Sequence, residues 1–137
     1  MVKVYRITIP SDNIEASVLF YATLLEVAGS RISPGRHYFD CEGTIISCYD
    51  AIANGDARAP RANEDYIYFA VDDIDAVYAR ARAAGAPLDE ADVPTVGALG
   101  KVLTRPWGER SFYTRDPSGN PLCFAARDTL FTSGTLP

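Results

Sequence analysis

The sequence predicts an α+β fold built from two βαβββ modules that follow one another along the chain. Short runs of β-branched and aromatic residues, separated by turn residues, predict strands, and two amphipathic segments that each follow a strand predict helices. A set of matching residues also recurs sixty positions further on. With 137 residues and 47% hydrophobic content, the chain has the size and the apolar material of one domain with a core.

The first module begins with a strand over residues 2–10. Asp12 is a good N-cap, and Glu15 three residues later completes a capping box, so a helix is predicted to start here and to end near Gly29. The apolar face of this helix, which could cover a sheet, is predicted to contain Ile14, Val18, Tyr21 and Leu25. Three further strands are predicted over residues 31–33, 37–41 and 44–49.

The second module repeats this order after a loop without apolar periodicity. A strand over residues 66–71 precedes a helix that Asp72 is predicted to cap, with Asp75 at the capping-box position. The predicted apolar face of this helix contains Ile74, Val77, Tyr78 and Ala81. After a loop over residues 87–94, strands are predicted over residues 100–104, 111–114 and 122–125.

The repeat itself is visible when Ile14 is set against Ile74. The pairs that then coincide are Ile7 with Ile67, Asp12 with Asp72, Asn13 with Asp73, Glu15 with Asp75, and Ala16 with Ala76. We therefore expect a single domain over residues 1–137, with module one at 1–50, a linker at 51–64, module two at 65–127 and a tail at 128–137. Leu130 and Phe131 are candidate anchors for the tail.

The last two strands form a predicted hairpin with a distinctive sequence. Trp107-Gly108 opens it, and Asp116-Pro117-Ser118-Gly119-Asn120 is a strong reverse turn before the apolar run that ends at Ala125. This hairpin resembles the C-terminal hairpin of the glyoxalase/bleomycin resistance/dioxygenase proteins, the vicinal oxygen chelate superfamily. The resemblance, which extends over nearly the whole chain through the paired modules, implies a curved, cup-shaped mixed sheet with helices on the outside, and commonly a homodimer.

The resemblance also implies four positions at which related enzymes hold a divalent metal with His, Glu or Gln. In this chain those positions are occupied by Arg6, Ser47, Tyr66 and Cys123. Only the thiol is a plausible donor, and a guanidinium about 4 Å from a dication would be repelled by roughly 8 kcal/mol. We therefore expect no metal and no cofactor. The chain's only histidine, His37, is interpreted as a hydrogen-bonding group on another strand.

The same positions, with aromatic neighbours, define the predicted ligand-binding residues: Arg6, Ser47, Tyr49, Tyr66, Tyr68, Trp107 and Cys123. Arg6 could hold a carboxylate or another oxyanion, and strand alternation places Thr8, Tyr49 and Tyr68 on the cup-facing side. Simpler interpretations stay open beside each of these. The aromatic residues could be sheet packing, Arg6 could pair with Asp40 or Glu64, and Cys123 could be a small buried hydrophobe.

Composition excludes several classes of function. The net charge is −5 with scattered Lys and Arg residues, so nucleic acid is not an expected partner. No apolar run could span a bilayer, and three cysteines without paired spacing indicate reduced thiols and a cytoplasmic location. The chain also contains no glycine-rich phosphate loop, and no base is identifiable beside Ser47.

The leading hypothesis is a metal-free protein that binds a small organic molecule, aromatic or anionic, as bleomycin-resistance-like sequestration proteins do. One alternative is a cofactor-independent isomerase or lyase in which Arg6 polarises a carbonyl and Tyr66 acts as acid or base. Another is a metal-dependent enzyme of the glyoxalase or dioxygenase type with atypical ligands, and a third is an interaction module whose cup is filled by side chains. The ligand and the role of the tail stay open, as does whether one chain or a dimer forms the cup.

Overall fold

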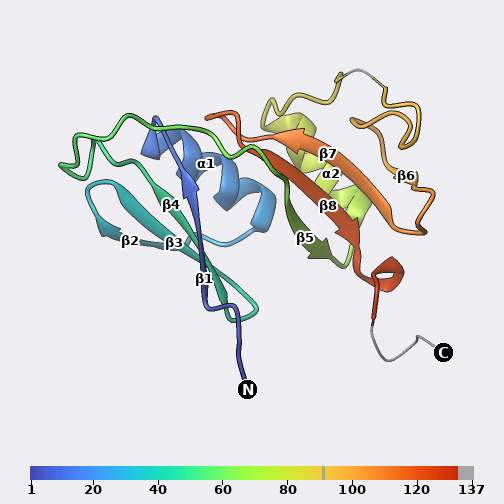
Figure 1. Cartoon of the computed structure of the whole chain (residues 1–137), viewed down its shortest axis with the longest axis horizontal. Helices are drawn as coiled ribbons and strands as arrows, with labels where there is room; N and C mark the ends of the chain where they lie inside the picture. The colour runs from blue at the N-terminus through green and yellow to red at the C-terminus, as the bar shows by residue number, and fades with distance from the viewer. Residues whose placement is uncertain (91, 133–137) are drawn as a thin grey trace. The chain divides into compact units, whose positions relative to one another are not determined.

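The computed structural model describes residues 1–90 and 92–132 of the chain. These fall into two compact units, residues 1–65 with 116–120, and residues 66–115 with the chain from 121 onward. Each unit contains a four-stranded sheet and an α-helix (Figure 1). Within the described ranges, no helix is long and apolar enough to cross a bilayer.

The first unit has the order strand, helix and three strands. Its elements are β1 (Arg6–Pro10), α1 (Ile14–Leu25), β2 (Ser30–Ser33), β3 (Arg36–Cys41) and β4 (Thr44–Tyr49). The sheet order is β1-β4-β3-β2, in which β1 and β4 are parallel and the other pairs are antiparallel. The helix α1 packs on β3 and β4, so one face of the sheet is covered (Figure 1).

The second unit has the same order of elements. They are β5 (Ile67–Val71), α2 (Ile74–Ala83), β6 (Leu103–Thr104), β7 (Arg110–Arg115) and β8 (Pro121–Ala126), followed by a short 3-10 helix η1 (Arg127–Thr129). Its sheet order, β5-β8-β7-β6, again has a parallel first pair and antiparallel remaining pairs. The predicted α+β class with two βαβββ modules is therefore confirmed. The residue boundaries proposed for modules, linker and tail stay predictions.

The two sheets also share their internal register. Thr8 is paired with Ser47 in the first sheet, and Tyr68, sixty residues after Thr8, is paired with Cys123 in the second. The cross-strand partner on the next strand is a tyrosine in both cases, Tyr38 opposite Ser47 and Tyr113 opposite Cys123. Ser47 and Cys123, two of the four positions that the resemblance implies, thus have equivalent places in the two sheets.

The helix caps lie one residue later than predicted. The side chains of Asn13 and Asp73 accept a hydrogen bond from the backbone N–H three residues on, at 3.1 Å in each case. Asp12 is used elsewhere, since its carboxylate accepts from Ser118 Oγ at 2.8 Å, and Asp72 pairs with Arg127 at 2.8 Å. In each helix two adjacent residues were able to cap, and contacts with distant residues decide between them.

The buried face of α1 also differs from the prediction. Ile14 and Tyr21 are buried as expected, but Val18 and Leu25 are only half-buried. The remaining buried residues of α1 are Ser17, Phe20 and Leu24. They pack with the sheet side that carries Ile9, Phe39, Ile46 and Cys48. In α2 the prediction is correct for Ile74, Val77 and Ala81, and Tyr78 is half-buried with its ring edge against Phe112.

Two predicted strands are shorter in the structure. The first begins at Arg6, which is paired with Ile45 near the start of β4. Before it, the Tyr5 carbonyl still accepts from the Ile45 N–H at 2.8 Å, but β4 begins only at Thr44 and leaves residues 2–4 without a paired strand residue. The predicted strand over residues 100–104 is reduced to β6, since backbone carbonyls before it are bonded to the Arg105 side chain instead. In the tail, Phe131 is exposed and does not act as an anchor, and residues 133–137 lie outside the described part.

Candidate functional site

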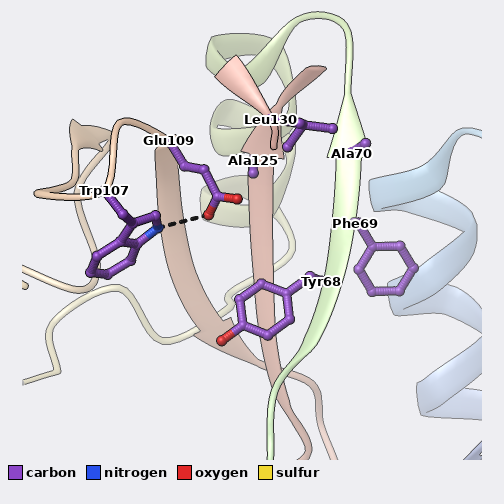
Figure 2. Close-up of a pocket in the computed structure, with 7 residues that line it drawn as sticks. All are labelled: Tyr68, Phe69, Ala70, Trp107, Glu109, Ala125 and Leu130. Carbon is purple, nitrogen blue, oxygen red and sulfur yellow. Dashed lines mark hydrogen bonds between the residues drawn. The ribbon is translucent and has the colours of Figure 1, made fainter. Parts of the chain in front are cut away.

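A cleft of about 380 Å³ lies over the uncovered face of the second sheet (Figure 2). It is lined by Tyr68, Phe69, Ala70, Trp107, Glu109, Ala125 and Leu130. The Tyr68 and Trp107 side chains are 62% and 52% exposed, whereas Ala125 is buried. Two large aromatic rings therefore border an apolar floor while remaining largely in contact with solvent.

Strand alternation aims Tyr68 into this cleft. In β5 the side chains of Tyr68 and Phe69 point to opposite sides of the strand, as Figure 2 shows. Phe69 stacks on Phe124 at a ring distance of 5.1 Å, on the side of the sheet where α2 packs on β8. Tyr68 shares its face with Cys123 and with the ring of Tyr66, which is 6.3 Å away.

The turn between β6 and β7 holds Trp107 and Glu109. Gly108 takes a positive φ of 98°, which a side chain would disfavour, and its N–H donates to the carbonyl of Arg105 at 2.9 Å. The indole Nε1–H of Trp107 then donates to Oε1 of Glu109 at 2.8 Å (Figure 2). Trp107 is one of the residues predicted from the sequence, whereas Glu109 is not. The available signal was the i, i+2 spacing across a glycine, which places both side chains on one side of a tight turn.

Arg105, at the start of this turn, holds the turn in place through its side chain, and it is also absent from the residues predicted from the sequence. Only 2% of it is exposed, and its guanidinium lies over the ring of Tyr113. It donates to the side chain and carbonyl of Ser111 and to carbonyls of the preceding segment, at Val96, Ala98, Leu99 and Lys101. Among the described residues no carboxylate forms an ion pair with it. Because the guanidinium is buried and has no carboxylate beside it, its charged form is disfavoured and the pKa of Arg105 is lowered.

Cys123 and Tyr66 are both held in their protonated forms at neutral pH. Burial raises the pKa of the Cys123 thiol to about 11, against a smaller opposite effect of hydrogen bonds from Ser111 and Tyr113. Burial, followed by the charge of Glu90, raises the pKa of Tyr66. Cys123 is fully buried, as the simpler interpretation expected, and it does not line the cleft.

In the first unit, Arg6 is bound to aromatic side chains. It donates a hydrogen bond to the Tyr38 hydroxyl, and its guanidinium lies 5.5 Å and 5.6 Å from the ring centres of Tyr38 and Tyr5. The suggested pairing of Arg6 with Asp40 or Glu64 is wrong, because Glu64 pairs with Arg61 and no Arg6 ion pair occurs among the described residues. A cleft of about 440 Å³ includes Tyr38 and Asp40 beside it.

Tyr49 lines a different cleft of about 370 Å³, over the first sheet. Thr8 shares this cleft with Tyr49, as alternation predicted, and the wall is formed by Pro10, Ala51, Arg58, Ala59, Pro60 and Arg61. The Tyr49 hydroxyl donates to Asp56 at 3.3 Å, and Arg36 lies 4.2 Å from its ring centre. Ser47 on the same strand is fully buried, and its hydroxyl has no hydrogen-bond partner in the described part of the chain.

Of the seven predicted ligand-binding residues, Tyr68 and Trp107 thus line one cleft and Tyr49 another.

His37, interpreted as a hydrogen-bonding group, is buried beside Phe39. It accepts from Arg31 Nε at 3.4 Å and donates to the Ala28 carbonyl at 2.9 Å. These bonds occupy both ring nitrogens.

The donor chemistry does not fit a divalent metal at the four equivalent positions. In the first unit these are a guanidinium and a buried hydroxyl, at Arg6 and Ser47. In the second they are Tyr66 and Cys123, whose raised pKa values keep both groups protonated. Across residues 1–90 and 92–132, no group of three or more His, Cys, Asp or Glu residues is arranged to hold a metal ion.

Comparisons with known proteins agree with this architecture. A protein from Mycobacterium tuberculosis whose name describes it as a glyoxylase, CFP32, is 32% identical over 105 residues, which cover 72% of this chain. The chain spans only 38% of the length of that relative, and the same values hold for its counterpart in Mycobacterium bovis.

Solved structures are similar at the level of the fold. A glyoxalase/bleomycin resistance protein from Albidiferax ferrireducens T118 has a TM-score of 0.68 and 19% identity, with 90% of this chain and 97% of that one covered. A lactoylglutathione lyase from Agrobacterium tumefaciens has a TM-score of 0.66 and 19% identity, with 90% and 92% covered. A family model, Glyoxalase/Bleomycin resistance protein/Dioxygenase superfamily, matches residues 3–124. The chain therefore belongs to the glyoxalase/bleomycin resistance protein/dioxygenase superfamily.

Proposed function

We propose that this chain binds a small aromatic or amphipathic organic molecule without a metal, as a sequestration or resistance-type protein does. The observation that carries the proposal is the cleft over the second sheet, where Tyr68 and Trp107 are 62% and 52% exposed above an apolar floor. Its volume of about 380 Å³ suits a small ligand. Covering two exposed rings with a flat apolar group removes a large apolar area from water, which favours binding.

The proposal includes the absence of a catalytic metal. Its support is the chemistry of the four positions that carry metal ligands in similar enzymes. At those positions Arg6 brings a fixed positive charge, and the Cys123 thiol, with a pKa of about 11, is not available as a thiolate at neutral pH. A metal-dependent enzyme with atypical ligands would need donors other than these.

The proposed ligand-binding set also contains Arg6, Ser47, Tyr49, Tyr66 and Cys123. Tyr49 is supported by its place in the cleft over the first sheet, and Arg6 by its exposure beside Tyr38. An anionic group on the ligand would be the natural partner of Arg6. We propose in addition a homodimer, which the family resemblance implies, and a cytoplasmic location, for which the free thiols of the three cysteines are the support. Light scattering on the purified chain should then give twice the mass of one chain.

The alternative is a cofactor-independent isomerase or lyase that uses Arg6 and Tyr66. The raised pKa of Tyr66 supports a role as proton donor rather than as base, because the phenol keeps its proton at neutral pH. Once a substrate is known, Arg6→Met and Tyr66→Phe decide this alternative. Unchanged turnover in both variants would eliminate it.

The binding proposal can be tested with the chain's only tryptophan, Trp107, as the reporter. Its indole N–H gives one NMR peak, which a panel of small aromatic compounds such as benzyl alcohol and benzoate should shift in a saturable way. Tyr68→Ala should weaken that binding about tenfold, since one stacking surface is lost. Leu19→Ala is the control, because Leu19 is a large apolar residue of α1 that is 71% exposed and lines none of the three clefts. A panel that leaves the indole peak unmoved would refute the proposal.

A further inference from the structure

We infer that the cleft over the second sheet selects a small organic cation, an alkyl- or arylammonium compound. This inference rests on the proposed function, because it names the chemical class of ligand for the same cleft. The three groups that carry it are the Glu109 carboxylate and the rings of Trp107 and Tyr68, which Figure 2 shows on the same side of the sheet.

Glu109 gives the cleft its charge. Of the lining residues that the structure describes, Glu109 is the one with a charged side chain, and the others are aromatic or aliphatic. Its side chain lines the cleft together with Tyr68 and Trp107, and its carboxylate points toward the indole (Figure 2). A ligand that enters the cleft therefore meets a negative charge beside an apolar floor.

The hydrogen bond from the indole fixes this charge in place. Trp107 Nε1 donates to Oε1 of Glu109 at 2.8 Å, so one oxygen is used and the carboxylate is held next to the ring. In the described part of the chain no second hydrogen bond to this carboxylate occurs, which leaves Oε2 able to accept from an ammonium group or to lie against a quaternary one. A ligand in the cleft therefore meets the negative charge of Glu109 and the indole ring of Trp107 side by side.

The two aromatic rings add to the preference for a cation. The faces of indole and phenol rings attract ammonium groups, by about 0.5–1 kcal/mol each at exposed sites. Trp107 and Tyr68 are both exposed enough to present a face to a ligand. Because the indole edge is tied to Glu109, its face is the part left for the ligand.

Positive side chains of the same sheet do not compete for this role. The guanidinium of Arg105 is buried and bonded to carbonyls and to Ser111, so a ligand in the cleft does not reach it. Arg110 pairs with Asp75 on α2 at 3.3 Å, and Arg115, at the other end of β7, pairs with Glu90 at 2.8 Å. An anionic ligand would meet Glu109 here without a compensating charge, and the net charge of −5 would disfavour its approach.

The test compares three probes of similar size and different charge: benzylammonium, benzyl alcohol and benzoate. Each is titrated into the full chain and into Glu109→Gln, with calorimetry and the Trp107 indole peak as readouts. The glutamine oxygen can still accept the indole hydrogen bond, so this variant removes the charge and keeps the geometry. We expect the cation to bind about fivefold more tightly than benzyl alcohol, and benzoate to bind most weakly.

In Glu109→Gln the affinity for the cation should fall about threefold while that for benzyl alcohol stays the same. Equal affinities of the wild-type chain for cation and alcohol, with saturable binding of both, would overturn the charge inference and leave the proposed function intact. Equal losses of affinity for all three probes in Glu109→Gln would also overturn the charge inference, because the residue would then act through its shape alone. If none of the probes binds to the wild-type chain, both the inference and the proposed function fail.

Discussion

Arg105 is buried in the second unit with carbonyl oxygens as its main partners. A buried guanidinium normally pairs with a carboxylate, but here the hydrogen bonds go to the backbone of residues 96–101 and to Ser111. Its role is therefore to hold a segment without regular structure against the sheet below the Trp107 turn. Such a role depends on the number of donors as much as on the charge.

Removing this side chain should leave several carbonyls unsatisfied. Arg105→Met is expected to lower the free energy of unfolding by about 3 kcal/mol or more, and Arg105→Lys by less, since lysine keeps the charge and some donors. Urea denaturation followed by circular dichroism measures both. Arg61→Met is the matched control, because that side chain is 86% exposed, and it should change stability by less than about 0.5 kcal/mol. Similar losses in both positions would contradict this role.

Cys123 should make stability depend on pH in the alkaline range. The thiol is neutral when protonated, and burial raises its pKa from 9.0 to about 11, so the folded chain holds this proton more tightly than the unfolded chain. The contribution of the protonated thiol to the free energy of unfolding is fully present below pH 9 and is lost as the pH rises through 11. Over this window the loss is about 2–3 kcal/mol. Cys123→Ala should show a flatter stability profile between pH 9 and 11 than the wild-type chain, and parallel profiles would contradict the prediction.

At the scale of elements, the turn after β7 is organised around one buried carboxylate. Asp116 accepts from the backbone N–H groups of Ser118 and Asn120 at 2.9 Å each and from Asn120 Nδ2 at 2.8 Å. The Tyr21 hydroxyl on α1 also donates to it, at 2.6 Å, and all these residues belong to the first unit. The sequence predicts the turn from local chemistry, but the bond to Tyr21 spans 95 positions.

A double-mutant cycle measures that long-range bond. Tyr21→Phe and Asp116→Asn should each destabilise the chain, and the pair should show a coupling energy of about 1.5–3 kcal/mol, since one partner is charged and the site is buried. Burial and the negative charge of Asp116 already raise the pKa of Tyr21 well above its ordinary value. Additive effects of the two substitutions would mean that the bond contributes nothing beyond local structure.

The elements also show which features the sequence could predict. Alternating apolar runs predicted most of the strands, and the repeat predicted their grouping, because these signals are local or periodic. The choice of Asn13 over Asp12 as the N-cap was not predictable. Both side chains can cap a helix, and Asp12 is occupied by Ser118, which is 106 positions away.

The candidate site was only partly predictable for a related reason. Tyr68 and Trp107 were identified from alternation and from the hairpin signature, and the structure brings them to one cleft. Glu109 and Arg105 were missed because their roles come from which groups surround them after folding. An exposed glutamate on a turn and an arginine before a proline are ordinary features in a sequence, and only their contacts distinguish them.

At the scale of the whole molecule, the two modules share strand order and register but differ in the chemistry of their uncovered faces. The first presents Arg6 and Tyr49 with further arginines, and the second presents Tyr68, Trp107 and Glu109. Neither carries a set of metal donors among the described residues. The two modules thus share their backbone pattern, while their uncovered faces differ in charge.

The stability of the whole molecule should therefore not change when divalent metals are added. After treatment with EDTA, adding Mg²⁺, Mn²⁺, Ni²⁺ or Zn²⁺ at 1 mM is expected to shift the melting temperature by less than about one degree. A site with a Kd near 10 μM would instead stabilise the fold by about 2.7 kcal/mol at that concentration, which is several degrees. Calorimetric titration provides the second readout. One tightly bound metal per chain would contradict both this prediction and the metal-free proposal.

Ser47 adds a consequence for stability. Its hydroxyl is fully buried and has no hydrogen-bond partner in the described part of the chain, so the fold bears an uncompensated desolvation of about 1–3 kcal/mol at this position. Ser47→Ala should accordingly raise the midpoint of urea denaturation, and a lowered midpoint would show that the hydroxyl is satisfied after all. The equivalent place in the second module already holds the less polar Cys123. The two modules thus differ at this position in the polarity of one buried atom, and the first module bears the larger desolvation cost.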